Sequence, residues 1–380
     1  MTTSTPVALP VIPALPSALV AQWITAHNAN ADALAEMPSS LAAHVQEWQS
    51  EHAMEGLSGI AASVSGAVDL PLFPSRRAFL SDHDRARLAG CRAGLDHVEV
   101  RITLTREHRV DRLLEPETPF VLHALVEGPD TTGDVSNPGL LRVNDTRFAM
   151  RQSTYSLPDP NAARQLLAAF TARLAEEGTE REGTEREGTD LAVAAWAIFT
   201  FLAIHPFVDG NGRTARLLYL LLASRRLRAP DLGALEMLTL DRQGYIAALA
   251  DAYNVTEHWD PAALDATAFT RLVATWSLRG ADVYRQRIVS AGAAGSVADQ
   301  VHAGLTRDDV GWIVRLWMDG SWIGRNGAAF DHLADRGLVE RFPAPPSRSI
   351  GNRTALAYRL IPALRDTLDA GVIEHVAASA

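Results

Sequence analysis

The chain has 380 residues, of which 47% are hydrophobic and 21% are charged, and its formal net charge is −10 at pH 7. This composition is typical of globular proteins, and the length allows about two or three domains. The acidic balance disfavours a general nucleic-acid binder, because such proteins usually carry a basic excess.

All basic residues other than histidine are arginines, because the sequence contains no lysine. This absence excludes the Walker P-loop, the protein-kinase fold and pyridoxal or Schiff-base chemistry, each of which needs a lysine. The single cysteine, Cys91, excludes intramolecular disulfides and cysteine-based zinc sites. Any phosphate group that this protein binds must therefore be held by arginine, by backbone amides or by a metal ion.

The N-terminal part of the chain predicts helices after an irregular start. Residues 1–18 contain four prolines and no periodic pattern, so we expect a disordered or extended lead-in. Apolar residues recur at helical spacing from Leu19 to about Gly56, with Pro38-Ser39-Ser40 as the start of a second helix. Further helix and loops are expected over 57–110.

The middle of the chain predicts a hairpin followed by buried helices. β-forming residues cluster around Asn144-Asp145 within 142–155, which favours a short hairpin, and a helix is expected over 161–175. The repeat of five residues over 177–190 contains nothing apolar to bury and predicts a solvated loop. Thr189 and Asp190 can then cap a helix, apolar on nearly all faces, that ends at Ile204. The next helix is expected over 213–222.

The C-terminal part predicts a winged helix-turn-helix. The small residues of 291–298 indicate a linker, and Thr306 and Asp309 predict a capping box that opens a helix to 318. A helix over 326–336 and two strands over 338–342 and 355–360 complete the expected order. We therefore expect a mostly α-helical chain divided as follows: 1–18, lead-in; 19–115, N-terminal helical region; 116–290, catalytic core; 291–300, linker; 301–380, winged helix-like domain.

The turn between the two central helices, residues 205–216, carries the chemistry. Pro206 and the glycines at 210 and 212 force a tight turn whose backbone N–H groups can face an anion, next to the positive end of the following helix. Arg213 and Arg216 lie three residues apart on one face of that helix, where each can donate two hydrogen bonds to a phosphate.

Two more residues of this turn complete a set for phosphoryl or nucleotidyl transfer. Asp209 supplies the hard carboxylate oxygen that Mg²⁺ prefers. His205 is the nearby group that titrates near neutrality and can accept a proton. Each residue alone fits an ordinary helix corner, but their convergence on one turn favours catalysis based on positioning and charge neutralisation.

The segment His205-Pro-Phe-Val-Asp-Gly-Asn-Gly-Arg-Thr-Ala-Arg216 resembles the signature of the Fic family at every specified position. The similarity covers about 122–288 and implies a Fic-type helical core with a small β-hairpin flap. It also implies an adenylyltransferase that uses ATP and Mg²⁺, in which His205 deprotonates a Ser, Thr or Tyr hydroxyl of a target protein.

Further roles follow from the same resemblance. Asp209 is expected to hold Mg²⁺. The remaining expected nucleotide-binding residues are Gly210, Asn211, Gly212, Arg213, Arg216 and, on a downstream helix with Arg242, Tyr245. Gly139-Leu-Leu-Arg142 resembles the segment that leads into the target-docking flap.

Met54-Glu55-Gly56 resembles the family's inhibitory pattern, although position 51 is Glu instead of Ser or Thr. Glu55 is therefore a candidate regulatory residue that competes with the γ-phosphate for Arg216. A surface glutamate at a helix end, followed by a glycine cap, explains the same three residues equally well.

Two other functions remain open from the sequence. One is the hydrolytic removal of AMP from a modified protein by the same site. The other is a DNA-binding regulator, in which Arg325, Asn326, Arg348 and Arg353 touch phosphates; residues 301–365 carry nine arginines against six acidic residues. The winged unit could equally dock on a partner or form a homodimer, and self-modification is a further expectation.

We expect a cytoplasmic protein without membrane contact. The longest apolar run, 191–204, is too short to span a bilayer, and the N-terminus shows no signal-peptide pattern.

Overall fold

The computed structural model describes residues 8–58, 82–107, 113–128, 138–145, 147–150, 153–178, 189–253, 264–302, 304–320, 322–323, 327–343 and 356–379. The helices are α1 (Ser17–Glu36), α2 (Ser39–Ser58), α5 (Asp82–Arg106), α6 (Thr118–Glu127), α7 (Pro160–Gly178), α8 (Thr189–Ile204), α9 (Asn211–Ala223), α10 (Leu232–Leu240), α11 (Arg242–Ala252), α12 (Thr267–Val301), α13 (Arg307–Asp319), α14 (Gly327–Asp335) and α15 (Pro362–Ser379). The strands are β1 (Arg147–Met150), β2 (Ser153–Ser156), β3 (Trp322–Ile323), β4 (Val339–Pro343) and β5 (Leu356–Leu360). The predicted mostly α-helical fold with a small antiparallel hairpin is confirmed.

Two hydrophobic clusters organise the described residues. The larger cluster surrounds α8 and α9, which pack against each other, and every residue from Leu191 to Phe201 is buried. A helix that is apolar on all faces can be stable only in the interior of a domain, which explains the central place of α8. The smaller cluster joins α13, α14, α15 and strands β4 and β5 to the C-terminal part of α12.

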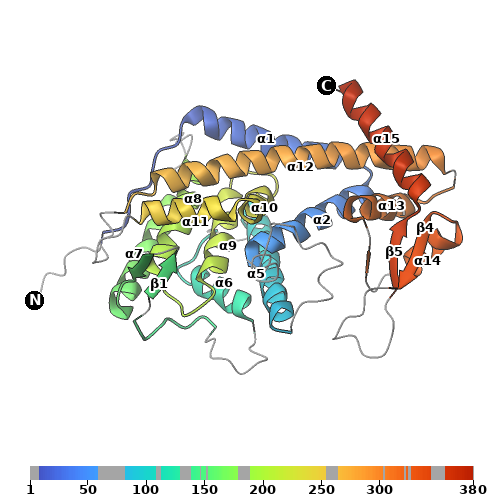
Figure 1. Ribbon diagram of the computed structural model, residues 1–380. Coiled ribbons are helices and arrows are strands. Elements are labelled where there is room, and N and C mark those ends of the chain that lie inside the picture. The colour runs from blue at the N-terminus through green and yellow to red at the C-terminus, as the bar shows by residue number, and fades with distance from the viewer. Residues whose placement is uncertain are drawn as a thin grey trace, which may run out of the picture.

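Three helices, α1, α2 and α12, belong to both clusters (Figure 1). Helix α1 contributes Trp23 to the larger cluster and Leu34 to the smaller one. Helix α12 has 35 residues, so it is about 52 Å long at 1.5 Å per residue. Helix α2 contributes Leu41 and Val45 to the smaller cluster and Ala53 and Leu57 to the larger one. The catalytic core and the C-terminal unit are therefore connected by continuous helices.

A buried ion cluster fixes α2 against the C-terminal unit. The guanidinium of Arg315 on α13 has no exposed side-chain surface; its Nε lies 2.6 Å from Asp319 Oδ2, and its Nη2 pairs with Glu51 of α2. Trp48 of α2 donates from Nε1 to Asp319 Oδ1 at 2.7 Å. Because an unpaired charge at a buried position is strongly destabilising, these contacts hold the two helices in one register.

The region 291–298 is helical and is not a linker. It forms the C-terminal part of α12, and its small residues serve close packing. A Cβ atom on Gly295 would lie 2.8 Å from Leu41 Cδ2, so a larger residue there would push α2 away. Alanine is also the best helix former, and a run of small residues does not by itself indicate flexibility.

One other expectation is corrected for the described residues, and one is confirmed. Residues 8–16 are irregular but packed: Leu15 is buried, and the Pro10 carbonyl accepts a 2.9 Å hydrogen bond from Trp196 Nε1. The hairpin expected within 142–155 is confirmed: Met150 pairs with Ser153 across β1 and β2, and Asn144-Asp145 precede β1. The end of the repeat, 189–190, begins α8, whereas 179–188 lie outside the described residues.

The C-terminal unit has the expected order of helix, helix and two paired strands. Thr306 and Asp309 form the predicted capping box of α13. Strand β5 pairs antiparallel with β4, with Val339 opposite Leu360, and also with the short strand β3, which the sequence did not predict. The sheet order is β3-β5-β4.

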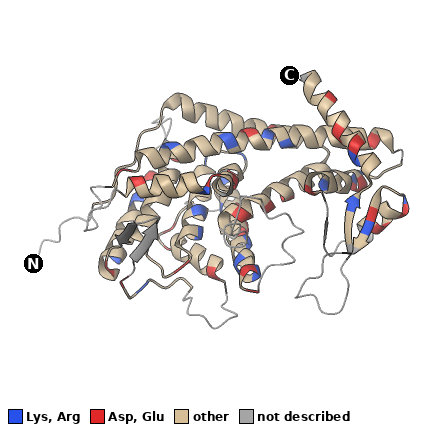
Figure 2. Ribbon diagram, viewed as in Figure 1, with Lys and Arg blue, Asp and Glu red and all other residues tan. Residues whose placement is uncertain are grey.

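Acidic residues lie on α14 and α15 of this unit, and basic residues lie on its strands β4 and β5 (Figure 2). Asp331 and Asp335 on α14 both pair with Arg341 of β4, and α14 contains no arginine. The four residues expected to touch DNA, Arg325, Asn326, Arg348 and Arg353, lie outside the described residues. Within the described ranges, no helix is both long enough and apolar enough to cross a membrane.

A buried polar network joins four helices of the larger cluster. Asp231, which is fully buried, caps α10 by accepting from Ala234 N–H. Its Oδ2 also accepts hydrogen bonds from the Tyr219 hydroxyl of α9, at 2.6 Å, and from the Ser277 hydroxyl of α12. Trp23 of α1 donates to the same Ser277 oxygen at 2.7 Å. One carboxylate therefore satisfies donors that the fold has removed from water.

We expect Asp231→Ala to lower the free energy of unfolding by about 3–5 kcal/mol, because it removes a helix cap and leaves two buried hydroxyls without an acceptor. Urea denaturation monitored by circular dichroism measures this. Asp32→Ala, which removes the exposed partner of Arg228, is the matched control and should change the unfolding free energy by less than about 1 kcal/mol. Equal effects of the two substitutions would contradict the assignment.

Candidate functional site

The chain leaves α8 at His205 through a strained backbone conformation. His205 has φ 49°, and no other non-glycine residue of the described ranges has a positive φ. Its N–H still bonds to the Phe201 carbonyl at 2.9 Å, and Pro206 disfavours a continuation of the helix. A non-glycine residue is held in this region only by its surroundings, and such strain concentrates at functional sites.

Arg142 holds the strained residue from the other side. Its Nε donates to the His205 carbonyl at 2.8 Å, and its backbone N–H donates to the Pro206 carbonyl at 3.0 Å. The guanidinium also donates to the carbonyls of Asn144 and Pro158, and Arg142 is only 2% exposed. The segment that leads into the hairpin is therefore attached directly to the turn that bears His205.

Asn211 closes the turn on itself. Its Oδ1 accepts from Phe207 N–H at 3.0 Å, and its Nδ2 donates to the Phe207 carbonyl at 2.8 Å. Both polar atoms of the side chain are thus used within the protein, so Asn211 shapes the site through its side chain and can meet an anion through its backbone N–H. The first-turn N–H groups of α9 have no intrahelical acceptor and face the space before the helix.

Gly210 is required by both its backbone and its neighbours. It adopts φ 74°, and an added Cβ would lie 2.3 Å from Glu127 Oε1 and 3.0 Å from His123 Cδ2. Helix α6 therefore packs directly on the turn. Gly212 leaves space for the second arginine in a similar way, since a Cβ there would lie 3.1 Å from Arg216 Nη1.

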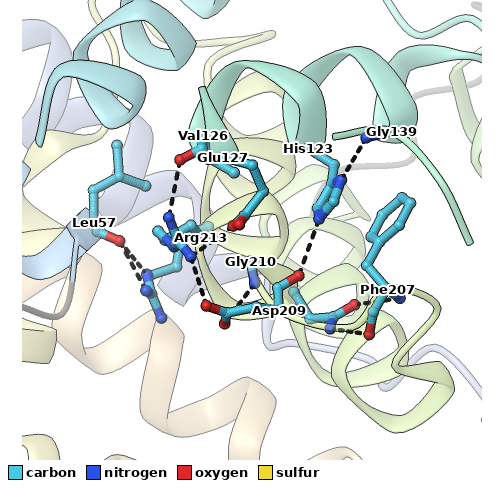
Figure 3. Close-up of polar contacts among 11 residues, drawn as sticks. Leu57, His123, Val126, Glu127, Gly139, Phe207, Asp209, Gly210 and Arg213 are labelled. Atoms are coloured by element: carbon cyan, nitrogen blue, oxygen red, sulfur yellow. Dashed lines mark hydrogen bonds and ion pairs between the residues drawn. The ribbon is translucent and has the colours of Figure 1, made fainter. Parts of the chain in front are cut away.

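The first arginine of the turn is shared among three acceptors (Figure 3). Arg213 Nη1 donates to the Val126 carbonyl at 2.9 Å, and Nη2 lies 2.6 Å from Glu127 Oε1 and 3.2 Å from Asp209 Oδ2. Arg213 and Glu127 are both 6% exposed in their side chains, whereas the Asp209 side chain is 67% exposed. Asp209 is thus held by a buried cation and still faces solvent.

The second arginine is buried against the end of α2. Arg216 is 8% exposed, and its Nε and Nη2 donate to the Leu57 carbonyl at 3.2 and 2.8 Å. Across the described ranges no carboxylate pairs with Arg216. A carbonyl satisfies a guanidinium less well than an anion does, so this cation can gain from a phosphate.

Helix α6 contributes a buried histidine to the turn. His123 is 2% exposed, and its ring stacks on Phe207 with a centroid distance of 3.7 Å and an interplanar angle of 11°. Nδ1 accepts from Gly139 N–H at 2.9 Å, and Nε2 lies 3.0 Å from the Asp209 carbonyl oxygen. Burial lowers the pKa of His123 to about 4, so the ring is neutral near pH 7.

The ionisation states of the turn suit acid–base chemistry. Burial, together with the charge of the Arg142 guanidinium, lowers the pKa of His205 to about 4, so the imidazole is unprotonated at neutral pH. Burial acts to raise the pKa of Asp209, but the Gly210 N–H and Arg213 outweigh it and hold that pKa below its usual value. The turn thus presents an unprotonated imidazole beside an ionised carboxylate.

Residues 120–223 match the sequence model of the Fic/DOC family. This match agrees with the geometry of the turn. Residues 120–223 belong to the Fic/DOC family. A Fido domain-containing protein of Dictyostelium discoideum is 63% identical over 27 residues, which are 7% of this chain and 19% of that protein. The match therefore spans about a fifth of that relative's length.

Solved structures were compared with this chain as well. A Fic family protein from Desulfovibrio desulfuricans G20 has a TM-score of 0.52 at 14% identity, covering 93% of this chain and 98% of that one. Fic-1 from C. elegans is 21% identical with a TM-score of 0.45, covering 71% of this chain and 72% of that one. The likeness to the Desulfovibrio protein is one of fold across nearly the whole chain, including its C-terminal part.

The Fic domain brings the predicted residues of the 205–216 turn together at the start of α9. Tyr245 lies at the start of α11 and is 8% exposed; burial raises its pKa against the opposing charge of nearby Arg216. Its buried hydroxyl has no hydrogen-bond partner among the described residues. Glu55 is 2% exposed on the last turns of α2, but no ion pair joins it to Arg216.

Three contributors to the site of the Fic domain were not predicted from the sequence: His123, Glu127 and the Leu57 carbonyl. His123 and Glu127 are four residues apart on one face of the short apolar helix α6, and this i, i+4 pair of titratable groups was a usable signal. The Leu57 contact is made by a backbone atom, for which the sequence contains no signal.

The lowered pKa of His205 predicts the pH dependence of a reaction that uses it as a base. Because the neutral form is the base, activity should be full above about pH 5 and should fall as the pH drops through about 4. A single-turnover rate profile from pH 4.5 to 8, with circular dichroism at each pH to confirm folding, tests this. An acidic limb centred near 6.5 would contradict it.

Proposed function

We propose that this Fic domain transfers AMP from ATP to a Ser, Thr or Tyr hydroxyl of a protein substrate. The main observation in support is that Arg213, Arg216 and the N-terminal end of α9 converge on one point, beside a neutral His205. Arg216 is buried against a carbonyl and pairs with no carboxylate in the described ranges, so its guanidinium can gain from a phosphate. Triphosphate binding at such a point needs no lysine.

In the proposed reaction the hydroxyl oxygen attacks the α-phosphorus. The bond between the α-phosphorus and the oxygen that bridges it to the β-phosphorus breaks, so pyrophosphate leaves. His205 accepts the hydroxyl proton, and the hydrogen bond from Arg142 to its carbonyl keeps the ring at the turn. Arg213 and Arg216 bind the phosphates and neutralise the charge that develops on them. The strained backbone at His205 fixes the base before the substrate arrives.

The carboxylate of Asp209 fits a magnesium ion. It is 67% exposed, ionised at neutral pH and made of the oxygen donors that Mg²⁺ prefers. When bound, Mg²⁺ would neutralise phosphate charge. The Gly210 N–H donates to Asp209 Oδ1, and Arg213 donates to Asp209 Oδ2. These two hydrogen bonds orient the carboxylate toward the proposed position of the phosphates.

The structure supports the catalytic turn, and not the C-terminal unit, as the origin of the function. Helix α14, which would lie in a DNA groove, contains no arginine and exposes Asp331 and Asp335. Within its described residues this helix offers no guanidinium of its own to a DNA phosphate.

We expect transfer of label from α-³²P-ATP to protein, with Mg²⁺ present, by the wild type and a loss of at least about 100-fold in His205→Ala. Gel autoradiography of the purified protein and of a cell lysate measures it. His302→Ala, which removes the histidine at the C-terminal end of α12, should keep wild-type activity.

A parallel reaction with γ-³²P-ATP distinguishes the outcomes of that experiment. Label from the γ-phosphate instead of the α-phosphate would replace adenylyl transfer by phosphoryl transfer. Release of AMP from a previously modified protein, without labelling, would replace it by the hydrolytic reaction.

We also propose that the end of α2 restrains the site. The Leu57 carbonyl occupies donors of Arg216 that a phosphate needs, and α2 is anchored at Glu51, less than two turns earlier, by the Arg315 cluster. The carboxyl group of Glu55, two residues before Leu57, is nearly fully buried in the same segment. ATP must displace the carbonyl to reach Arg216.

Glu55→Gly and Glu55→Gln separate inhibition by the Glu55 carboxyl group from restraint by the Leu57 carbonyl. If the carboxyl group inhibits, both variants should raise the labelling rate about tenfold or more. If the position of Leu57 is the restraint, only Glu55→Gly should do so, because glycine loosens the end of the helix. Initial rates at subsaturating ATP measure this. No change in either variant would exclude inhibition through Glu55.

A further inference from the structure

We infer that His123 is a positioning residue, which fixes the turn bearing His205 and Asp209 relative to the segment that leads into the hairpin. The inference rests on the proposed function only where activity is the readout. It concerns a residue on α6, outside the 205–216 turn, whose contacts have no other evident purpose than to join these two segments.

The hydrogen bonds of His123 allow a single tautomer. Nδ1 accepts a hydrogen bond from Gly139 N–H at 2.9 Å, so the ring proton must be on Nε2. Nε2 lies 3.0 Å from the Asp209 carbonyl oxygen and donates to it. Both nitrogens are therefore used, each in the only role that its partner permits, and Figure 3 shows the ring between Gly139 and Asp209.

The plane of the ring is fixed as well. It stacks on Phe207 at 3.7 Å, and the backbone of Phe207 is held on both sides by Asn211. The ring edge lies against Gly210, where a Cβ would come within 3.0 Å of His123 Cδ2. A ring with two directed hydrogen bonds, a stacking partner and a close edge contact has no freedom to rotate.

The two segments that His123 joins serve opposite sides of the proposed reaction. Gly139, at φ 75°, begins the short segment to Arg142, whose guanidinium binds the His205 carbonyl. Asp209 and Gly210 form the side that faces the phosphates. The imidazole thus sets the distance between the base and the nucleotide, which an in-line transfer requires to be correct within a fraction of an ångström.

A histidine that only fills the core would stabilise the protein without controlling the reaction. Three substitutions separate these roles. His123→Phe keeps the ring and its stacking but neither hydrogen bond, His123→Gln can keep the donor to Asp209, and His123→Asn can keep the acceptor for Gly139. Val121→Ala is the control on the same helix, since Val121 is 41% exposed.

The measurements are the thermal midpoint, kcat and KM for α-³²P-ATP labelling, and hydrogen–deuterium exchange of peptides covering 138–142 and 205–211. For His123→Phe we expect a fold that remains cooperative, a kcat lower by about 100-fold and a smaller change in KM for ATP. Exchange should accelerate in both peptides. His123→Gln should keep slow exchange only in the peptide 205–211, and His123→Asn only in the peptide 138–142. Each of these two variants should recover part of kcat.

An unchanged kcat in His123→Phe, or a loss that follows the thermal midpoint across all variants including Val121→Ala, would overturn the inference. If the wild type transfers no nucleotide, the proposed function fails. The positioning role is then decided by exchange alone: acceleration in both peptides supports it, and acceleration in neither or in one overturns it.

Discussion

Two buried guanidinium groups at the start of one helix are the constraint on which this site depends. Removing an arginine from water is costly unless its donors are satisfied, and α9 itself offers no acceptor at its N-terminal end. Arg213 and Arg216 therefore need partners from elsewhere in the chain. Helix α6 supplies a carbonyl and the Glu127 carboxylate, and α2 supplies the Leu57 carbonyl.

The arrangement of the surrounding helices follows from these needs. Helix α6 must approach the turn closely enough for Glu127 to touch Gly210, which excludes any side chain at position 210. Helix α2 must end at Arg216, while its other half packs into the C-terminal cluster and accepts a hydrogen bond from Arg315 at the His44 carbonyl. The C-terminal unit is thereby part of the scaffold that determines where Leu57 lies.

Local pattern was sufficient to predict much of this structure. The helices around the site, the capping box at Thr306 and the residues of the 205–216 turn follow from periodicity, turn residues and a long specific motif. The neighbours of the turn could not be predicted in this way, because His123 and Leu57 lie about 80 and 150 residues before it, and one of them acts through its backbone. The small residues of 291–298 were misinterpreted as a linker because close packing and flexibility select similar residues. Only the contact of Gly295 with Leu41 distinguishes the two.

The continuity of α12 has a consequence for how such chains can change in length. One residue inserted between the two clusters would turn everything beyond it by about 100° and shift it by about 1.5 Å. Seven residues, close to two full turns, would nearly restore the angle but would separate the clusters by about 10 Å. Because α1 and α2 span the same two clusters, they would need matching insertions. The spacing between the catalytic core and the C-terminal unit is therefore set by three helices that can lengthen only together, and its favoured values are whole helical turns.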